Sequence, residues 1–445
     1  MKKVILNTLA VLTAITLVLI GTASILAVRM TVIEAEATLA SDSSSEISSI
    51  ELASEAASAD AKPEEAAAES SLIAAAGKEE PDTPEVPEEV IEPDTVTVVM
   101  VGDILLHMPI ENASKDENGN YDFNPIFANM KDEIIAADIA IVNQEVIIGG
   151  EELGISGYPC FNAPYPIGDA LVNAGFDVVL HATNHALDKG KTGLMNTINY
   201  WRDNHPDITV LGINETEEDK ERVDIIEKNG IKIAILNYTY GTNGIPMPGG
   251  MPYAVDLLEE EKVKQDLAYA EENADFTIVC PHWGTEYNLG TDNMQQKWAA
   301  IFREGGADLV IGAHPHVIEP VEFMEDETPG HSNNHGGGDM LVYYSLGNFV
   351  SWTSSSGPGI TKRMVGGMAQ VTIQKMPEEE AVITDHGVEA LVAHLSRQHH
   401  GVSVYRLTSY TEEQAKTNAI DIQDNTFTRQ QCVDICHEVW GMDWN

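Results

Sequence analysis

The amino-acid sequence predicts an α/β protein, in which buried strands alternate with helices along most of the chain. Short, nearly continuous apolar runs occur at residues 96–101, 138–143, 177–181, 232–237, 275–281, 308–313 and 340–345, and a further strand is indicated at 364–374. Segments with a helical pattern lie between them at residues 193–204, 256–273 and 293–304. Strands that are apolar on both faces are typical of sheets covered by helices.

Residues 1–29 are predicted to form a transmembrane signal-anchor. Lys2 and Lys3 precede an uncharged run of 25 residues, 4–28. As a helix this run would extend roughly 37 Å, which is enough to cross a hydrocarbon core of about 30 Å. A cleaved signal peptide, with an Ala-Glu-Ala site at 35–37, is the alternative. The two lysines favour a cytoplasmic N-terminus, so we expect a single-pass protein of the cell membrane with its C-terminal domain extracellular.

Residues 30–95 are predicted to be a disordered linker. The segment is rich in Ser, Ala, Glu and Pro and holds 18 acidic residues against two lysines. Its few apolar side chains could not bury enough surface to offset the entropy lost on ordering, and its charges repel one another.

The charge of the whole chain limits its partners. There are 71 acidic residues against 25 basic ones, a formal net charge of −46. This balance argues against a nucleic-acid partner, which requires a basic face. Four cysteines provide no disulfide framework. Cys432 and Cys436 are interpreted as two buried side chains, with a local disulfide as the alternative.

Six of the predicted strands are followed by polar side chains that can bind a metal. Open α/β sheets build their sites at the carboxyl ends of strands. These residues are Asp103, Asn143 with Glu145, Asn184 with His185 and Asp188, His282 with Glu286, His314 with His316, and Asn348. A mixed set of carboxylate, carboxamide and imidazole ligands suits Mn, Fe or Zn better than Ca. We therefore predict two divalent transition metal ions, which together can activate a bridging water.

The order of these motifs resembles a known family. The motifs are Gly102-Asp103, Asn143-x-Glu145, Asn184-His185-x-x-Asp188, His282-Trp283-Gly284-x-Glu286-Tyr287, His314-Pro315-His316-Val317 and Tyr344-Ser345-Leu346-Gly347-Asn348-Phe349. Together they look like the capsule-synthesis family for poly-γ-glutamate, the CapA type, which is similar to calcineurin-like metallophosphoesterases. The resemblance implies a layered αββα sandwich over residues 96–355, with 356–445 as a C-terminal extension packed on it.

The resemblance also implies a role for each residue. One metal would be held by Asp103, Glu145 and His316, and the other by Glu145, Asn184, His282 and His314, so that Glu145 bridges the two. His185 would act as the general acid or stabilise an oxyanion, and Asp188 and Glu286 would orient histidines. Asn143, Asn348 and His107 would support the site or contact substrate. The chain departs from the pattern at Leu105, where the phosphoesterases have a histidine; His107 comes two residues later.

Three classes of function are compatible with these residues. The first is a metallophosphoesterase-like hydrolase in capsule or poly-γ-glutamate biosynthesis or export, acting on an anionic polymer or a small phosphoester and working with synthase or export subunits. The second is a non-catalytic accessory subunit that binds the polymer, and the third is a structural protein with a vestigial site. A phosphoesterase unrelated to capsule is a further alternative. Because the protein is strongly acidic, we expect an anionic substrate to be held at the metals rather than along an extended face.

Overall fold

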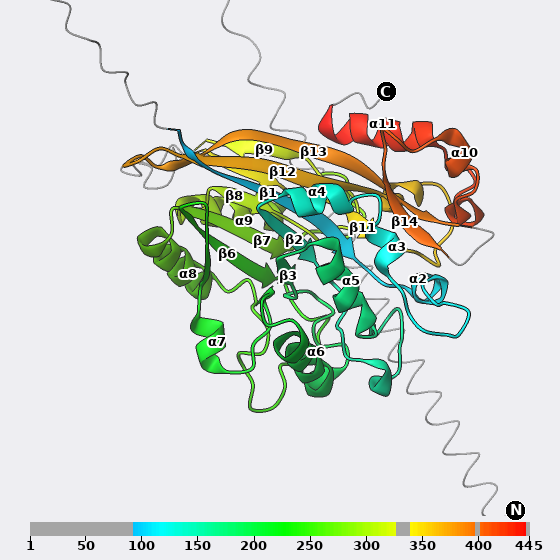
Figure 1. Cartoon of the computed structure of the whole chain (residues 1–445), viewed down its shortest axis with the longest axis horizontal. Coiled ribbons are helices and arrows are strands. Elements are labelled where there is room, and N and C mark those ends of the chain that lie inside the picture. The colour runs from blue at the N-terminus through cyan, green and yellow to red at the C-terminus, as the bar shows by residue number, and fades with distance from the viewer. Residues whose placement is uncertain (1–91, 326–338, 397–400, 442–445) are drawn as a thin grey trace, which may run out of the picture. The chain divides into compact units, whose positions relative to one another are not determined.

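The computed structural model describes residues 92–325, 339–396 and 401–441, which form two β-sheets and the helices around them (Figure 1). The predicted signal-anchor and nearly all of the predicted linker lie outside the described residues. Within the described ranges no helix is long and apolar enough to cross a membrane.

The larger sheet is mixed and contains eight strands. They are β1 (Asp94–Ile104), β2 (Ile139–Asn143), β3 (Val178–Leu180), β4 (Thr209–Leu211), β11 (Asn348–Val350), β12 (Val365–Lys375), β13 (Ala381–Leu395) and β14 (Val402–Arg406). Their order is β14-β13-β12-β1-β2-β3-β4, and β11 pairs with β1 off this path. The strands β1 to β4 run parallel, whereas β12, β13 and β14 add to β1 in antiparallel fashion.

The smaller sheet contains six strands. They are β5 (Asp224–Lys228), β6 (Ile231–Thr239), β7 (Phe276–His282), β8 (Leu309–Ile311), β9 (Val321–Met324) and β10 (Met340–Tyr343), in the order β5-β6-β7-β8-β10-β9. The four central strands are parallel, and the edge strands β5 and β9 are antiparallel to their neighbours.

Helices cover the outer face of each sheet. The α-helices are α2 (Met108–Ala113), α3 (Asn124–Phe127), α4 (Lys131–Ala136), α5 (Pro166–Ala174), α6 (Gly190–Asn204), α7 (Glu217–Glu221), α8 (Glu260–Asn273), α9 (Asn293–Glu304), α10 (Glu412–Ala415) and α11 (Arg429–Trp440). Apolar side chains of α8 and α9 pack on the smaller sheet, whereas those of α3, α4, α5 and α11 pack on the larger one.

The side-chain alternation of the strands builds three apolar layers. Val98 and Met100 of β1 meet Ile233 of β6 in the layer between the sheets, whereas Val99 and Val101 face the helices outside. Successive side chains of a strand point to opposite faces, so a strand buried on both sides must be apolar throughout. The result is a mixed α/β sandwich with helices outside both sheets. The strand pattern predicts the α/β class, and the layered arrangement is the one that the family resemblance implies.

The predicted elements are found, with two informative differences. The helix predicted at 256–273 begins only at Glu260, because residues 256–258 exchange backbone hydrogen bonds with Thr239 at the end of β6. Residues 356–445 supply β12, β13 and β14, and β12 pairs with β1 from Asp94 to Val101, so this extension completes the larger sheet.

Cys432 and Cys436 are free and buried, so the alternative of a local disulfide is wrong.

Two glycines allow the strand ends to approach closely. A Cβ on Gly102 would lie 1.9 Å from the backbone oxygen of Gly347, and one on Gly312 would lie 2.1 Å from the oxygen of Tyr344. Directly after Gly102, the backbone N–H of Asp103 donates to the oxygen of Gly347 at 2.9 Å. Only a residue without a side chain can occupy such positions.

We expect the Gly102→Ala substitution to destabilise the protein by about 1–3 kcal/mol or more, because the new methyl group meets backbone that cannot move aside. Urea unfolding of the metal-free protein measures the effect. Gly249→Ala is the matched control, since nothing lies within 4 Å of its Cβ position, and it should change stability by less than about 0.5 kcal/mol. Equal stability of the two variants would contradict the close approach.

Candidate metal centre

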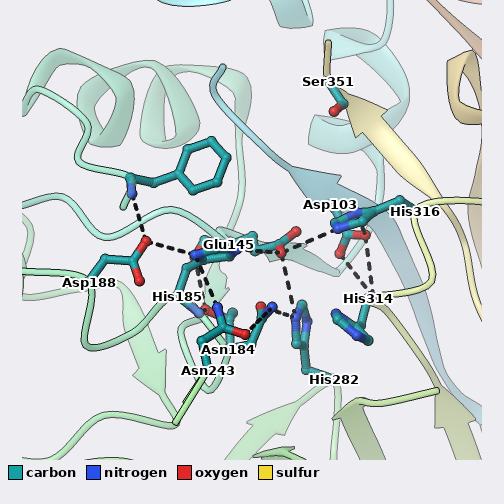
Figure 2. A network of polar contacts seen from close by, with 12 residues as sticks. Asp103, Glu145, Asn184, His185, Asp188, Asn243, His282, His314, His316 and Ser351 are labelled. Atoms are coloured by element: carbon teal, nitrogen blue, oxygen red, sulfur yellow. Dashed lines mark hydrogen bonds and ion pairs between the residues drawn. The ribbon is translucent and has the colours of Figure 1, made fainter. Parts of the chain in front are cut away.

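The predicted ligand residues converge where the carboxyl ends of strands from both sheets meet (Figure 2). Asp103 lies near the end of β1 and Glu145 follows β2 in the larger sheet, whereas His282 ends β7 and His314 follows β8 in the smaller one. The side chains brought together are Asp103, Asn143, Glu145, Asn184, His185, His282, His314, His316 and Asn348, and all are buried. Residues separated by more than 200 positions in the chain therefore share one buried polar cluster.

Glu145 occupies the centre of this cluster. Its Oε1 lies 3.6 Å from Nε2 of His316, 3.7 Å from Nε2 of His282 and 4.0 Å from Nε2 of His185. Neither carboxylate oxygen has a hydrogen-bond partner, although the residue is only 1% exposed. Burial raises the pKa of Glu145 well above its ordinary value. A buried carboxylate without donors is costly unless a cation compensates it.

Asp103 and His316 form one side of the cluster. Nδ1 of His316 lies 3.1 Å from Oδ2 of Asp103 and 3.1 Å from Oδ1 of Asn348. The other oxygen of Asp103 accepts a hydrogen bond from Nδ2 of Asn143 at 2.7 Å. Burial opposes a charge on His316, but the charges of Glu145 and Asp103 outweigh it and raise the pKa of His316 to about 9.

His282, Asn184 and His314 form the other side. Nε2 of His282 lies 3.0 Å from Oδ1 of Asn184, and Nδ1 of His282 lies 3.3 Å from Nδ2 of Asn143. The rings of His282 and His314 are 4.8 Å apart, and Nδ1 of His314 is buried without a partner. Burial, and then the neighbouring histidines, lower the pKa values of His282 and His314 well below their ordinary value. Both are therefore neutral, which is the form that binds metal.

The backbone around these ligands is unusual. His314, His316 and Tyr287 all have positive φ angles, of 99°, 57° and 66°. Residues with side chains rarely adopt this region, and such residues concentrate at functional sites. The backbone N–H of Tyr287 donates to the oxygen of Pro315 at 2.7 Å, which ties the two loops together. The loop after β8 thus aims two imidazoles, separated by one proline, into one cluster.

His185 is held in a fixed orientation by Asp188. Nδ1 of His185 lies 2.7 Å from Oδ2 of Asp188, and the same oxygen accepts the backbone N–H of Phe161 at 2.6 Å. The ring of Phe161 meets the ring of His185 edge-on, with centroids 4.7 Å apart. Nε2 of His185 is therefore left facing Glu145. A carboxylate on one imidazole nitrogen fixes the tautomer and the direction of the other.

Two predicted residues lie at the margin. His107 is half-buried before α2, where its ring meets that of Phe161 edge-on at 5.0 Å. Burial, followed by the charges of His316 and His185, lowers the pKa of His107 to about 4. Glu286 is exposed after β7. In the described part of the chain it makes no hydrogen bond to a ligand histidine; Asn143 and Asn348 make those contacts.

Several residues at the cluster have no signal in the sequence. The ring of Tyr240 lies 4.6 Å from that of His314, and Oδ1 of Asn243 accepts from Nδ2 of Asn184 at 3.3 Å. Both belong to the irregular segment after β6, which has neither a motif nor a periodic pattern. The guanidinium of Arg363 stacks on the ring of Tyr287. Only the tertiary fold brings these side chains to the cluster.

The cluster fits divalent metal ions. Ligand atoms of Glu145, His314 and His316 all lie within 4.8 Å of one another. The oxygens of Glu145 and Nδ1 of His314 are buried polar atoms without partners, which a metal would supply. Asp103, Asn184 and His282 extend the donor set on either side. Carboxylate with imidazole is a set that suits Mn, Fe or Zn.

We expect Glu145→Gln to make the stability of the metal-free protein less dependent on pH than that of the wild type, because the raised pKa of Glu145 makes its ionisation unfavourable to folding. Folding raises the pKa of Glu145 above its ordinary value of 4.5. Ionisation of Glu145 therefore leaves the free energy of unfolding unchanged below pH 4.5. It lowers that free energy progressively as the pH rises through the folded-state pKa. Added Mn²⁺ or Zn²⁺ should raise the melting temperature of the wild type but not of this variant.

Thermal unfolding at a series of pH values, with and without chelator, measures both effects. Glu117→Gln changes an exposed glutamate and serves as the control, which should behave as the wild type does. A Glu145→Gln protein whose stability falls with rising pH as steeply as that of the metal-free wild type, or that gains as much stability from metal, would contradict this description of the centre.

Comparison with known proteins identifies relatives. Residues 97–353 match the family described as bacterial capsule synthesis protein PGA_cap. The chain is 29% identical over 187 residues to the PGA biosynthesis protein CapA of Bacillus subtilis (strain 168) and 29% identical over 192 residues to the capsule biosynthesis protein CapA of Bacillus anthracis. Each match covers 41% of this chain, and spans 45% and 43% of the two relatives.

Among solved structures, the chain is similar to a putative 5′-nucleotidase from Staphylococcus aureus, with 16% identity and a TM-score of 0.41 over 66% of this chain and 54% of that one. At this level the similarity does not by itself define an activity. The family match, in contrast, covers more than half of the chain and includes every strand end that contributes a predicted ligand. This chain therefore belongs to the bacterial capsule synthesis protein family PGA_cap.

Proposed function

We propose that this protein is a metal-dependent hydrolase of capsule or poly-γ-glutamate biosynthesis or export, acting on a phosphoester or a related bond. The observation that carries the proposal is the Glu145 carboxylate, which is buried without a hydrogen-bond donor and has three imidazoles within 4.0 Å. The names of the two CapA relatives support the capsule context. A binding role needs no such array of imidazoles and carboxylates around one buried point.

Each residue of the cluster has a part in this proposal. Asp103, Glu145 and His316 would hold one ion, and Glu145, Asn184, His282 and His314 the other. When bound, two such ions would supply an activated water and neutralise the oxygens of the scissile group. Asn143 and Asn348 position ligands, since each hydrogen-bonds to a ligand imidazole or carboxylate.

His185 would handle the proton. Asp188 fixes Nδ1, so Nε2 is the nitrogen available to the substrate. In its protonated form Nε2–H can donate to a leaving-group oxygen or to a developing oxyanion. The edge-on contact with Phe161 and the burial of the ring limit the approach of water from that side. Asp188 acts as a positioning residue because it reaches substrate only through His185.

The cellular setting is part of the same proposal. The uncharged run at 4–28, followed by the acidic linker, supports a membrane anchor with the folded domain outside the cell. Synthase or export subunits for an anionic polymer would then be the partners. A non-catalytic, polymer-binding accessory role is the second candidate, and the activity test below separates the two.

We expect His185→Gln to lower kcat by about 10²- to 10⁴-fold, which is the usual contribution of a general acid, while the metal content stays that of the wild type. The measurement is hydrolysis of 4-nitrophenyl phosphate and bis(4-nitrophenyl) phosphate by the Mn²⁺- or Zn²⁺-loaded protein. His386→Gln, at an exposed position of β13, is the control and should leave the rate unchanged. A metal-loaded wild type that turns over neither compound would favour the accessory role, and a fully active His185→Gln variant would exclude His185 from the chemistry.

A further inference from the structure

A cationic side chain from the C-terminal extension lies beside the metal centre. The 3₁₀-helix η3 (Thr361–Met364) carries Arg363, whose Cζ lies 3.5 Å from the centre of the Tyr287 ring. That ring is in turn 5.9 Å from the ring of His316. Tyr287 thus connects the guanidinium with a predicted ligand.

The position of Arg363 is fixed by the same residue that fixes His316. Nδ2 of Asn348 donates to the backbone oxygens of His316 and Arg363, at 2.9 Å in each case. Nζ of Lys362 donates to the backbone oxygen of Tyr287, which holds η3 against the loop after β7. The Arg363 backbone is therefore rigidly attached to the metal centre.

The charge of Arg363 has no carboxylate partner among residues 92–325, 339–396 and 401–441. Its Nη1 donates to Oγ1 of Thr353 at 3.0 Å, and its Nε is buried without a hydrogen-bond partner. Arg202 pairs with Asp203 and Glu215, Arg222 with Asp219 and Asp224, and Arg406 with Glu133, whereas Arg303 donates to the backbone oxygen of Glu325. Acidic residues outnumber basic ones by 71 to 25, yet within the described residues no carboxylate lies within ion-pair distance of Arg363.

The charge of Arg363 also acts on the margin of the centre. It contributes, after burial and the charges of His316 and His185, to the lowered pKa of His107. His107 is therefore close enough to Arg363, His316 and His185 for the charge of each to affect it. An anion bound at the metals would lie in the combined field of the ions and this guanidinium.

We propose that Arg363 recognises a second oxyanion of the substrate, a carboxylate or a phosphoryl group, next to the group held at the metal centre. This inference rests on the proposed function, because the metals must hold the first anionic group. A guanidinium is a planar fork that binds oxyanions in bidentate fashion, and stacking on an aromatic ring orients it in advance. Arg363 is then a specificity-determining residue for substrates with two separate anionic groups.

Phosphonoalkanoates of increasing length test two properties together: the distance between the two anionic groups and the need for a charge on the second one. Phosphonoacetate, 3-phosphonopropionate and 4-phosphonobutyrate would each be compared with their carboxyl methyl esters, by calorimetric titration of the Mn²⁺-loaded full-length protein. The wild type should bind at least one acid about tenfold or more tightly than its ester, as expected for a charge-assisted hydrogen bond. Arg363→Met should reduce that preference to less than about twofold, and Arg363→Lys should restore only part of it.

Arg202→Met removes an exposed, paired arginine and is the control, so it should keep the wild-type preference. Metal content should be equal in all four proteins. Bisphosphonates of the same lengths distinguish a phosphoryl from a carboxylate as the preferred second group. A preference that survives in Arg363→Met overturns the inference alone. So does a wild type that binds methylphosphonate but prefers neither an acid over its ester nor a bisphosphonate over methylphosphonate at any length. Failure of metal-loaded wild type to bind methylphosphonate overturns the proposed function and this inference with it.

Discussion

Both oxygens of the Glu145 carboxylate are buried without a hydrogen-bond donor, and one of them faces three imidazole nitrogens. In an interior of low dielectric constant, this arrangement is unfavourable unless a positive charge completes it. His316 provides part of that charge when it is protonated, since its pKa is raised to about 9. A divalent ion would provide more and would release the proton, because the ligand must be neutral. The surrounding fold keeps the Glu145 carboxylate buried, and this lowers the stability of the metal-free protein.

The sandwich architecture makes such a site possible. The larger sheet supplies Asp103 and Glu145, the smaller sheet supplies His282 and His314, and neither sheet alone carries a complete ligand set. The close contact of Gly102 with the segment before β11 brings Asn348 to His316. Because ligands come from both layers, metal binding and the packing of the sheets should stabilise each other. The residues after position 355 also contribute, through β12 in the larger sheet and through η3 beside the centre.

Local sequence is sufficient where local interactions decide the structure. Both ends of the helix Asn293–Glu304 agree with the predicted ones, and the helix begins at a capping box formed by Asp292 and Gln295. Most of the predicted ligands can be found because each follows a buried apolar strand, and the carboxyl ends of parallel strands meet at one edge. Their convergence supports the ligand set, although the role of each residue is still a prediction.

Where long-range packing decides, the sequence carries no local signal. The strands β13 and β14 are not predicted, because β13 contains an exposed polar stretch, residues 384–386, that breaks the apolar pattern. Tyr240 and Asn243 belong to an irregular segment, and Arg363 belongs to a single turn of 3₁₀-helix far along the chain from most of the ligands. The positive φ angles of His314 and His316 are likewise set by tertiary contacts. In each case the determining partner is distant in sequence.

Whether Glu145 bridges two metal ions is tested most directly by the metal content of the purified protein. Elemental mass spectrometry would be applied to protein prepared without chelator and then incubated with Mn²⁺ or Zn²⁺. We predict about two transition-metal ions per chain, as expected for a dinuclear centre. One ion per chain would mean that Leu105, in place of a histidine, has cost one of the two sites. A protein that binds no metal after incubation would contradict the assignment of Glu145 as a bridging ligand.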